Sequence, residues 1–482
     1  MKKILKTNTL ILIGGLLSSL LFTHQGFGWN VLLFTVFLAW ITHRQHSPHP
    51  YLMLATGNLL ALAILWTILD TQLVRTVYTL ALWVFIGVVQ APFLRFIWFS
   101  GILGIVSLIA APWYAIRPAR QWRSRPVFYW SAILLIPVAL LLTFSTLYTQ
   151  GSSTFANWFG HWEKLGTWLR EYLRPGPYLR SALPGILITG SLLTFSPWIT
   201  RLRNLESRWS DHLVRQRKRI SRSFPMLGLK REYLVGLISL GSLNGLLLLV
   251  NATDMYSLWL GQVPRTAQAL SEYVHEGTAY LILSIFLAAL VLLVFFRGNL
   301  NFFPDGGWLR RLAFLWIAQN AFLTLSVGLR NSFYTHTYGL TYLRIGLFFF
   351  LLLVLWGLFT LARKVARRHT VYRLLANNAL GWLIAFTLLS TTNWDIVITR
   401  YNLQELRREH LDTWHLLHMA SAKNMPLLLA NREALLADGY YSPEEIDGIL
   451  RQKRQKLTDH LEVKGPLGKT WQDRLLKRHV LD

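Results

Sequence analysis

The sequence predicts an all-α protein: a polytopic bundle of about 11–12 transmembrane helices followed by a soluble helical tail at the C-terminus. Hydrophobic residues make up 53% of the 482 positions and charged residues only 15%, a balance too apolar for an ordinary soluble domain. Apolar runs of membrane-spanning length alternate with short, arginine-rich loops from end to end. Aromatic residues reach 14%, and many lie at the ends of these runs, where the headgroup layer favours their amphipathic rings.

The first 200 residues form an N-terminal group of transmembrane helices. Three lysines precede an apolar run from Leu10 to Phe22. No small-residue cleavage site follows that run and another apolar run starts soon after it, so we interpret residues 8–24 as an uncleaved first span. The other apolar runs of this group lie near residues 29–43, 50–69, 76–92, 96–114, 127–147 and 180–199.

Residues 201–232 form a basic loop between the two groups of apolar runs. This loop has ten basic and three acidic residues, a net charge of +7, and we expect an amphipathic helix that lies on anionic lipid headgroups. The whole chain carries a net charge of +26. A nucleic-acid binder usually gathers its basic residues in one polar module, whereas this chain places them between apolar runs. We therefore expect no nucleic-acid partner.

Residues 233–396 form a second group of transmembrane helices, and residues 397–482 form a polar helical tail. Within the tail, Ser442 is followed by Pro443 and, three residues after the serine, by Glu445. Serine as N-cap, proline in the first turn and glutamate at the third position predict a helix that begins here. The apolar runs of the second group lie near residues 233–251, 274–296, 311–329, 343–362 and 378–396.

The loops after residue 115 alternate in charge, which predicts their orientation. One set of loops holds 22 basic residues and the intervening set holds 7. The positive-inside rule places the first set, with residues 201–232, in the cytoplasm and the tail on the outer side. Five spans before a cytoplasmic 115–126 loop would put the N-terminal lysines outside, against the same rule. We therefore expect one early segment to be re-entrant or interfacial, which leaves eleven spans.

Polar residues gather at the predicted outer face of the second group. Glu272, His275 and Glu276 share one helix face, because they are spaced by three and four residues. Ionisable groups near the hydrocarbon usually pair inside the bundle or line a wet cavity. We predict an outward-facing polar cavity between the last five spans; the alternative is a set of interface caps and structural ion pairs. The candidate catalytic residues are Glu276, His275 and Asp254, and the candidate binding residues are Arg330, Asn331, Tyr338, Tyr342, Arg344 and Asp395.

These residue types suit acid–base chemistry on an anionic substrate. Glu276 or Asp254 would be the general base and His275 its acid–base partner. Arg330 and Arg344 would hold a phosphate or carboxylate group. The same residues suit a structural ion-pair network equally well. The chain has no cysteine, and no second histidine follows His275 at the spacing of a metalloprotease helix, so we expect neither a metal site nor a cofactor.

Two phrases in the second group resemble a known family. In Ser271–Thr278, a tyrosine, a small residue, a basic residue and a glycine open a span. The second phrase consists of Arg330, Tyr334, Tyr338–Thr341 and Arg344. Over residues 233–402 the chain resembles a bacterial multi-pass membrane family known as domain of unknown function 4173, a relative of domain of unknown function 4153. His275 stands where that family has arginine, and Thr278 where it has an aromatic residue. The resemblance implies the multi-pass architecture and the place of the site, but no reaction.

We expect an integral protein of the bacterial cytoplasmic (inner) membrane that acts as a subunit, scaffold or sensor of a membrane complex, because no complete catalytic or ion-coupling set can be assembled. Its partners would be anionic lipids at residues 201–232 and proteins bound through that loop and through residues 397–482, a tail on the periplasmic side. Two alternatives stay open. One is a transporter or flippase of an envelope molecule, although paired broken helices are not evident. The other is a membrane-embedded transferase that acts at the outer face, so whether the protein is an enzyme remains open.

Overall fold

A computed structural model confirms the predicted fold class: every named element in the described part of the chain is a helix. The only β contact in that part is an isolated bridge between His212 and His369. The chain divides into two compact units, Met1–Gln25 with Ile105–Ser196, and Gly26–Gly104 with Pro197–Asp482. The structure describes residues 2–116, 176–193, 203–204, 206–215, 229–260, 267–296, 298–304, 306–405, 412–419, 421–436 and 440–478.

The first unit is built on α1 (Lys2–Phe22) and α8 (Pro177–Leu193), which pack along their length. The two helices run antiparallel: Ser18 near the end of α1 donates to the carbonyl of Ser181 near the start of α8, at 2.7 Å. Towards the start of α1, a Cβ on Gly14 would lie 2.1 Å from the hydroxyl of Thr189. Small residues at the crossing let the two backbones approach closely, as in other apolar helix pairs.

The second unit begins with α2 (Trp29–Gln45), α3 (Pro50–Leu69) and α4 (Gln72–Gln90), joined by short turns. These helices bury one face each against their neighbours, and α4 is the most buried of the three. After α4, the start of α5 (Ile97–Ile116) crosses it at glycines: a Cβ on Gly87 would meet the Ser100 carbonyl oxygen at 1.7 Å. This close approach fixes where the two helices cross.

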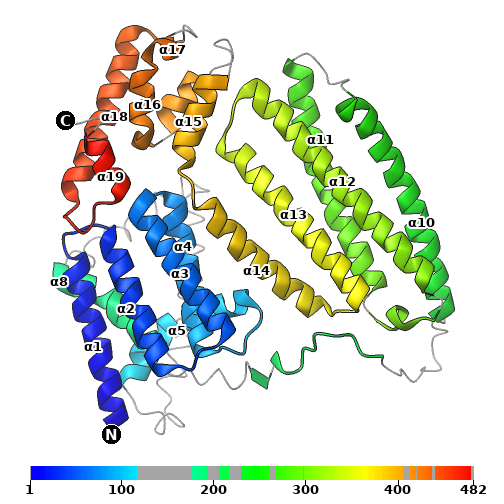
Figure 1. Ribbon diagram of the computed structural model, residues 1–482, viewed down its shortest axis with the longest axis horizontal. Helices are drawn as coiled ribbons and strands as arrows, with labels where there is room; N and C mark the ends of the chain where they lie inside the picture. The colour runs from blue at the N-terminus through cyan, green and yellow to red at the C-terminus, as the bar shows by residue number, and fades with distance from the viewer. Residues whose placement is uncertain are drawn as a thin grey trace, which may run out of the picture. The chain divides into compact units, whose positions relative to one another are not determined.

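Five long helices follow in the same unit: α10 (Leu229–Asp254), α11 (Ala267–Phe295), α12 (Gly307–Tyr338), α13 (Tyr342–Arg367) and α14 (Val371–Leu389). Helix α12 lies at the centre and packs against α10, α11 and α13, while α14 packs on α13 (Figure 1). Their shared core is apolar and includes Leu292, Leu309 and Leu358. Apolar contact of this kind on several faces is typical of helices within a bundle.

The tail forms its own small helical core. It contains α15 (Trp394–Glu405), α16 (Met425–Ala430), α17 (Arg432–Leu436), α18 (Pro443–Val463) and α19 (Trp471–Leu476). Buried side chains from these helices pack together and against Ile345 in the first turns of α13. The predicted start of α18 is confirmed: the Ser442 hydroxyl accepts from the Glu445 N–H, and the Glu445 carboxylate accepts from the Ser442 N–H.

Several helices are long and apolar enough to cross a membrane. Five pass on length and hydropathy within the described residues, and a sixth span arises if α14 and α15, bent by 63° at their break, are taken together. Three further helices, α1, α5 and α11, contain apolar stretches over Thr7–Phe22, Ile97–Ile109 and Leu281–Phe295. Eleven of the twelve predicted apolar segments coincide with helices, and the twelfth, 127–147, lies outside the described residues. The apolar character thus supports a multi-pass membrane protein.

Two predicted span boundaries and one predicted helix were wrong. The last span of the second group starts at Val371 and ends at Leu389, earlier than the predicted 378–396, because Ser390–Asn393 form a turn. Helix α12 extends nine residues beyond the predicted 329, so that Tyr338 is its last residue. Residues 207–215, expected within an amphipathic helix, form turns and extended chain that pair with the α13–α14 connection.

Candidate functional site

Asp254 and Arg330, two of the predicted site residues, form a buried ion pair. Asp254 ends α10 and Arg330 lies near the end of α12, and only 4% and 7% of the two residues is exposed. The Arg330 guanidinium donates directly to the Asp254 carboxylate. Two opposite charges that are buried together compensate in part for the loss of water around each, and removing either one leaves the other buried without its partner. The pair therefore fixes the end of α10 to α12.

A seam of amides continues from this ion pair along the α10–α12 contact. Gln319 donates from Nε2 to Oδ1 of Asn244 at 2.7 Å, and Asn251 donates to the Gln319 carbonyl at 3.2 Å. Asn244 also donates to the Leu312 carbonyl at 3.1 Å. All three amides are buried. Polar side chains that bond across two apolar helices set their register and hold them together.

Arg344, in the first turns of α13, folds back on the end of α12. Its guanidinium lies 4.3 Å from the ring centre of Tyr334 and donates to the carbonyls of Tyr338, at 2.9 Å, and Gly339. Asn331 donates in turn to the Arg344 carbonyl at 3.1 Å. The carbonyls at a helix C-terminus carry partial negative charge, which a cation stabilises. Arg344 thus closes α12 and orients the turn into α13.

Asp395 connects the membrane helices to the tail. Its carboxylate accepts hydrogen bonds from the Tyr342 hydroxyl at the start of α13 and from the Ser421 hydroxyl at 2.5 Å. The backbone N–H of Ser421 also donates to it, at 3.2 Å. Asp395 itself is 8% exposed. Three donors satisfy this buried carboxylate, and their hydrogen bonds attach α15 to the start of α13 and to Ser421.

The predicted group is therefore distributed over three separate contacts among the described residues. Asp254 and Arg330 join α10 to α12; Asn331, Tyr338 and Arg344 join α12 to α13; and Tyr342 and Asp395 join α13 to the tail. The other two candidates, His275 and Glu276, lie within α11, but their side chains lie outside the described residues. The described members of the group all carry structural contacts.

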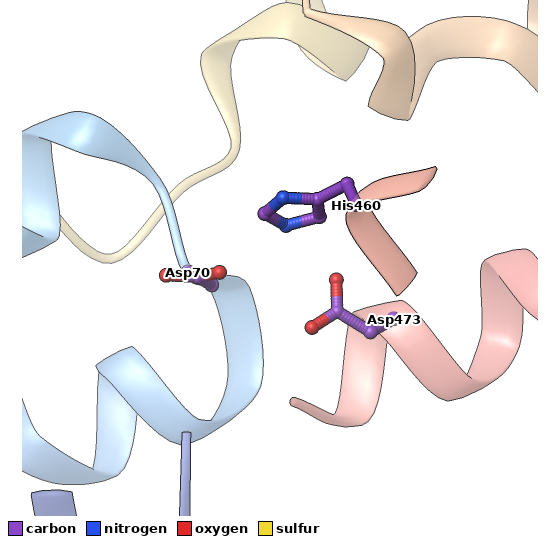
Figure 2. A group of neighbouring side chains, drawn as sticks. All are labelled: Asp70, His460 and Asp473. Carbon is purple, nitrogen blue, oxygen red and sulfur yellow. The ribbon is translucent and has the colours of Figure 1, made fainter. Parts of the chain in front are cut away.

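A second charged cluster, which the sequence analysis did not single out, lies between α3 and the tail (Figure 2). Lys464, just after α18, donates to the carboxylates of Asp70 at 2.6 Å and Asp473 at 2.7 Å. Both carboxylates are fully buried, and the lysine side chain is 6% exposed. Burying three charged groups is favourable only when they are paired this closely. We call Asp70, Lys464 and Asp473 the buried triad.

Local structure presents each member of the triad. Asp70 follows α3 in a left-handed conformation, with φ of 47°, where aspartate is better tolerated than most residues. Asp473 belongs to the first turn of α19 and forms a capping box with the N-cap Thr470. Arg75, one turn into α4, adds a second cation at 2.7 Å from Asp70. The ammonium of Lys464 is thus bound by one carboxylate from the membrane helices, Asp70, and by one from the tail, Asp473.

Lys423 and His460 lie beside the triad, and burial lowers the pKa of each. Burial lowers the pKa of Lys423, although Asp70 favours its charged form; its ammonium donates to the carbonyls of Leu69 at 2.5 Å and Asp70 at 2.8 Å. Burial and the neighbouring Lys464 also lower the pKa of His460. Burial alone would raise the pKa of Asp473, but hydrogen bonds from Lys464 and Thr470 outweigh it and bring that pKa below its usual range.

The same cluster has the donor set of a metal site. One ligand atom each from Asp70, His460 and Asp473 lies within 4.8 Å of the others, and carboxylate and imidazole are common ligands of divalent metals. The Lys464 ammonium, however, already bridges both carboxylates. With Lys423 and Arg75 adjacent, a further cation would meet net positive charge. We therefore interpret the cluster as an ion-pair network in which an ammonium takes the place of a metal.

A groove lies between α11, α13 and α14. Its volume is about 250 Å³, and residues such as Phe286, Val354 and Leu375 line it. None of the lining residues is charged, and the amide of Asn378 is bonded to Thr360 and to the Leu374 carbonyl. The groove has no group that would perform acid–base or nucleophilic chemistry.

Comparison with known proteins identifies a family but no activity. No curated protein and no solved structure matches the chain. One family model matches residues 51–431, and that family is described as Domain of unknown function (DUF4153). The resemblance stated from the sequence named a different but related family, 4173, and covered only 233–402. The match extends it to α3 and α4 and to the first part of the tail, and it ends before α17, α18 and α19. The chain therefore belongs to the family of Domain of unknown function (DUF4153).

Proposed function

We propose that the protein is a non-catalytic subunit or sensor of a bacterial inner-membrane complex and that it presents its helical tail to partner proteins. The observation that carries this proposal is the buried triad. Lys464 ties the tail to the end of α3 through two buried carboxylates, so the tail is a fixed extension of the membrane helices. A fixed tail suits a docking or sensing platform, whose surface must keep one orientation.

The contacts of the predicted site also support a structural role over the two alternatives. Asp254 and Arg330, which a transporter or transferase would use on a substrate, neutralise each other. Arg344 bonds to the carbonyls that end α12. Asp395 holds the tail. A catalytic carboxylate would need a suitable pKa and would have to point towards a substrate. These side chains instead bind one another or other groups of the protein.

The test compares variants of the tagged full-length chain purified from native membranes. Lys464→Met releases the tail from Asp70, whereas Lys456→Met removes an exposed lysine of α18 and is the matched control. The double variant Asp254→Asn with Arg330→Gln removes the α10–α12 charges together. Under the proposal, co-purifying proteins are lost only with Lys464→Met, and the double variant still complements a strain that lacks the protein.

The opposite pattern would favour the alternatives. If the double variant abolishes substrate flux or an envelope modification while Lys464→Met leaves both the complex and the complementation intact, the scaffold proposal fails. Loss of flux would then indicate a transporter, and loss of a modified envelope component would indicate a transferase.

A further inference from the structure

The end of the tail carries an exposed apolar strip. Val463 is 80% exposed, Trp471 56%, Leu475 40% and Leu467 36%. Their neighbours Leu461 and Leu476 are buried in the tail core, so the tail has already filled its own interior. A run of exposed large apolar side chains on a small helical unit usually marks a surface that is covered in the working protein.

This strip lies beside the ends of the membrane helices. The Leu467 carbonyl accepts from the backbone N–H of Asn30, in the first turn of α2, at 3.3 Å. A Cβ on Gly28 would lie 2.5 Å from the Gly468 carbonyl oxygen, so the two backbones touch. On the α2 side of this contact, Phe27 is 52% exposed and Trp29 36%. The apolar strip therefore continues onto the aromatic end of the apolar helices.

The charges around the strip are mostly positive. Cations lie on both sides of Trp471, the exposed Glu462 precedes Val463, and the nearby Asp473 is buried on Lys464. Tryptophan with lysine and arginine beside an apolar face is typical of segments that lie in the headgroup layer, where aromatic rings and cations both find partners. The flanking cations are Lys469, Arg474, Lys477 and Arg478.

We propose that residues 463–478 lie in the headgroup layer of the membrane that α2 and α3 cross, with Trp471 and Leu475 inserted and the flanking cations on anionic phospholipid headgroups. The occupant is a lipid surface, because the strip is continuous with the ends of apolar helices and is bordered by cations. This surface is distinct from the basic loop at 201–232 and goes beyond the proposed function, since it concerns a lipid contact that needs no partner protein.

The test uses the full-length chain, which has no native cysteine, in lipid nanodiscs without any other protein. Leu475→Cys and, as a control, Gln455→Cys on the exposed polar side of α18 are each spin-labelled. Access of the nitroxide to oxygen and to a water-soluble nickel chelate is then measured. We expect the label at 475 to be several-fold less accessible to nickel, and more accessible to oxygen, than the label at 455. Equal nickel access at both positions would overturn the proposal.

A second pair of measurements tests the headgroup chemistry. Nanodiscs of phosphatidylcholine are compared with nanodiscs that contain phosphatidylglycerol, with and without Arg474→Gln plus Lys477→Gln. We expect the label at 475 to lie deeper in nanodiscs that contain phosphatidylglycerol than in nanodiscs of phosphatidylcholine. This difference in depth is expected to disappear in the double variant. The same depth in both lipids would overturn the anionic part of the proposal. Because no partner is present, failure here would leave the complex proposed above unaffected, and the reverse also holds.

Discussion

Lys464 is the residue on which the attachment of the tail depends most. It supplies the positive charge nearest to the buried carboxylates of both Asp70 and Asp473. We predict that Lys464→Met destabilises the docked tail by about 3–5 kcal/mol, because two buried carboxylates would then face each other without this cation. The measurement is thermal unfolding of the purified chain in detergent, combined with the rate of tail cleavage by a protease.

Two variants make the result specific. Lys456→Met changes an exposed lysine on the same helix and is expected to have little effect, since exposed charges contribute about 0–1 kcal/mol. Adding Asp70→Asn to Lys464→Met removes one of the stranded charges and is expected to restore part of the loss. Equal stability of Lys464→Met and Lys456→Met would show that the triad does not hold the tail.

Lys453 predicts how the stability of the tail depends on pH. It is 9% exposed, and burial lowers its pKa to about 8, against about 10.4 in an unfolded chain. Between these values the unfolded tail binds more protons than the folded tail, so stability rises as the pH increases from 8 to 10. Lys423, whose pKa is also lowered, adds to the slope in the same direction.

The check is the midpoint of thermal unfolding at pH 7, 8, 9 and 10. Lys453→Met is expected to be more stable than the natural chain at pH 7 and to show a smaller rise towards pH 10, because its share of the slope is gone. An unchanged slope in Lys453→Met would contradict the assignment to this lysine.

At the scale of elements, the α4–α5 crossing depends on glycine. A Cβ at Gly87 would lie 1.7 Å from a backbone oxygen of α5 and one at Gly104 would lie 1.9 Å from a backbone oxygen of α4. We predict that Gly87→Ala pushes the helices apart and lowers stability by about 1–3 kcal/mol. Gly57→Ala on α3, where nothing lies within 4 Å of the added Cβ, is the control and is expected to be neutral or slightly stabilising. Similar unfolding temperatures for the two variants would contradict the close crossing.

The α10–α12 seam predicts a measurable coupling between two amides. Asn244 and Gln319 are bonded to each other at 2.7 Å and are both buried. Hydrogen bonds between membrane helices contribute about 0.6 kcal/mol on average and up to about 1.7 kcal/mol. A double-mutant cycle of Asn244→Ala and Gln319→Ala, followed by unfolding in detergent, is expected to give a coupling energy in this range. Additive effects would show that the two amides act independently.

Helices were predictable from the sequence because each is a local pattern. The apolar runs coincide with helices, and the start of α18 was visible in Ser442, Pro443 and Glu445, which lie within one turn. The buried triad was not predictable from the sequence, since Asp70 and Lys464 are 394 residues apart and come together only in the folded chain. One signal was present: Asp70 is the first carboxylate side chain of a strongly basic sequence. An isolated acid between two apolar runs indicates a partner, but it does not say which cation.

At the scale of the whole molecule, the residues at the two ends of α4 contact different parts of the chain. Asp70, just before α4, binds the tail, whereas Arg95, just after α4, binds Glu206 at 3.2 Å and Asp211 at 2.5 Å in the basic loop. The tail and the basic loop therefore lie at opposite ends of a 19-residue apolar helix. If the basic loop is cytoplasmic, as the positive-inside rule predicts, the tail lies on the outer side.

If the basic loop is cytoplasmic, the same contacts also predict a topology for the N-terminal half. With Arg95 inside, four crossings before it also bring the N-terminal lysines inside, in agreement with the positive-inside rule. In this predicted topology α8, which runs antiparallel to α1, crosses from outside to inside. Only one crossing then remains for the two apolar runs 96–114 and 127–147. The arginine-rich loop 115–126 is predicted to be cytoplasmic, so α5 (Ile97–Ile116) is the candidate for the segment that does not cross, and the total becomes eleven spans.

Cysteine labelling of intact cells tests this topology directly, because the chain has no cysteine of its own. We predict that an impermeant thiol reagent labels cysteines placed at Gln72 and Gln455, on the side of the tail. It is expected to leave cysteines at Ser47, Ser124 and Arg208 unlabelled until the cells are opened. Labelling at Ser47 in intact cells would restore five full spans before residue 115 and place the N-terminal lysines outside. Labelling at Ser124 alone would instead mean that α5 crosses the membrane and that residues 127–147 do not.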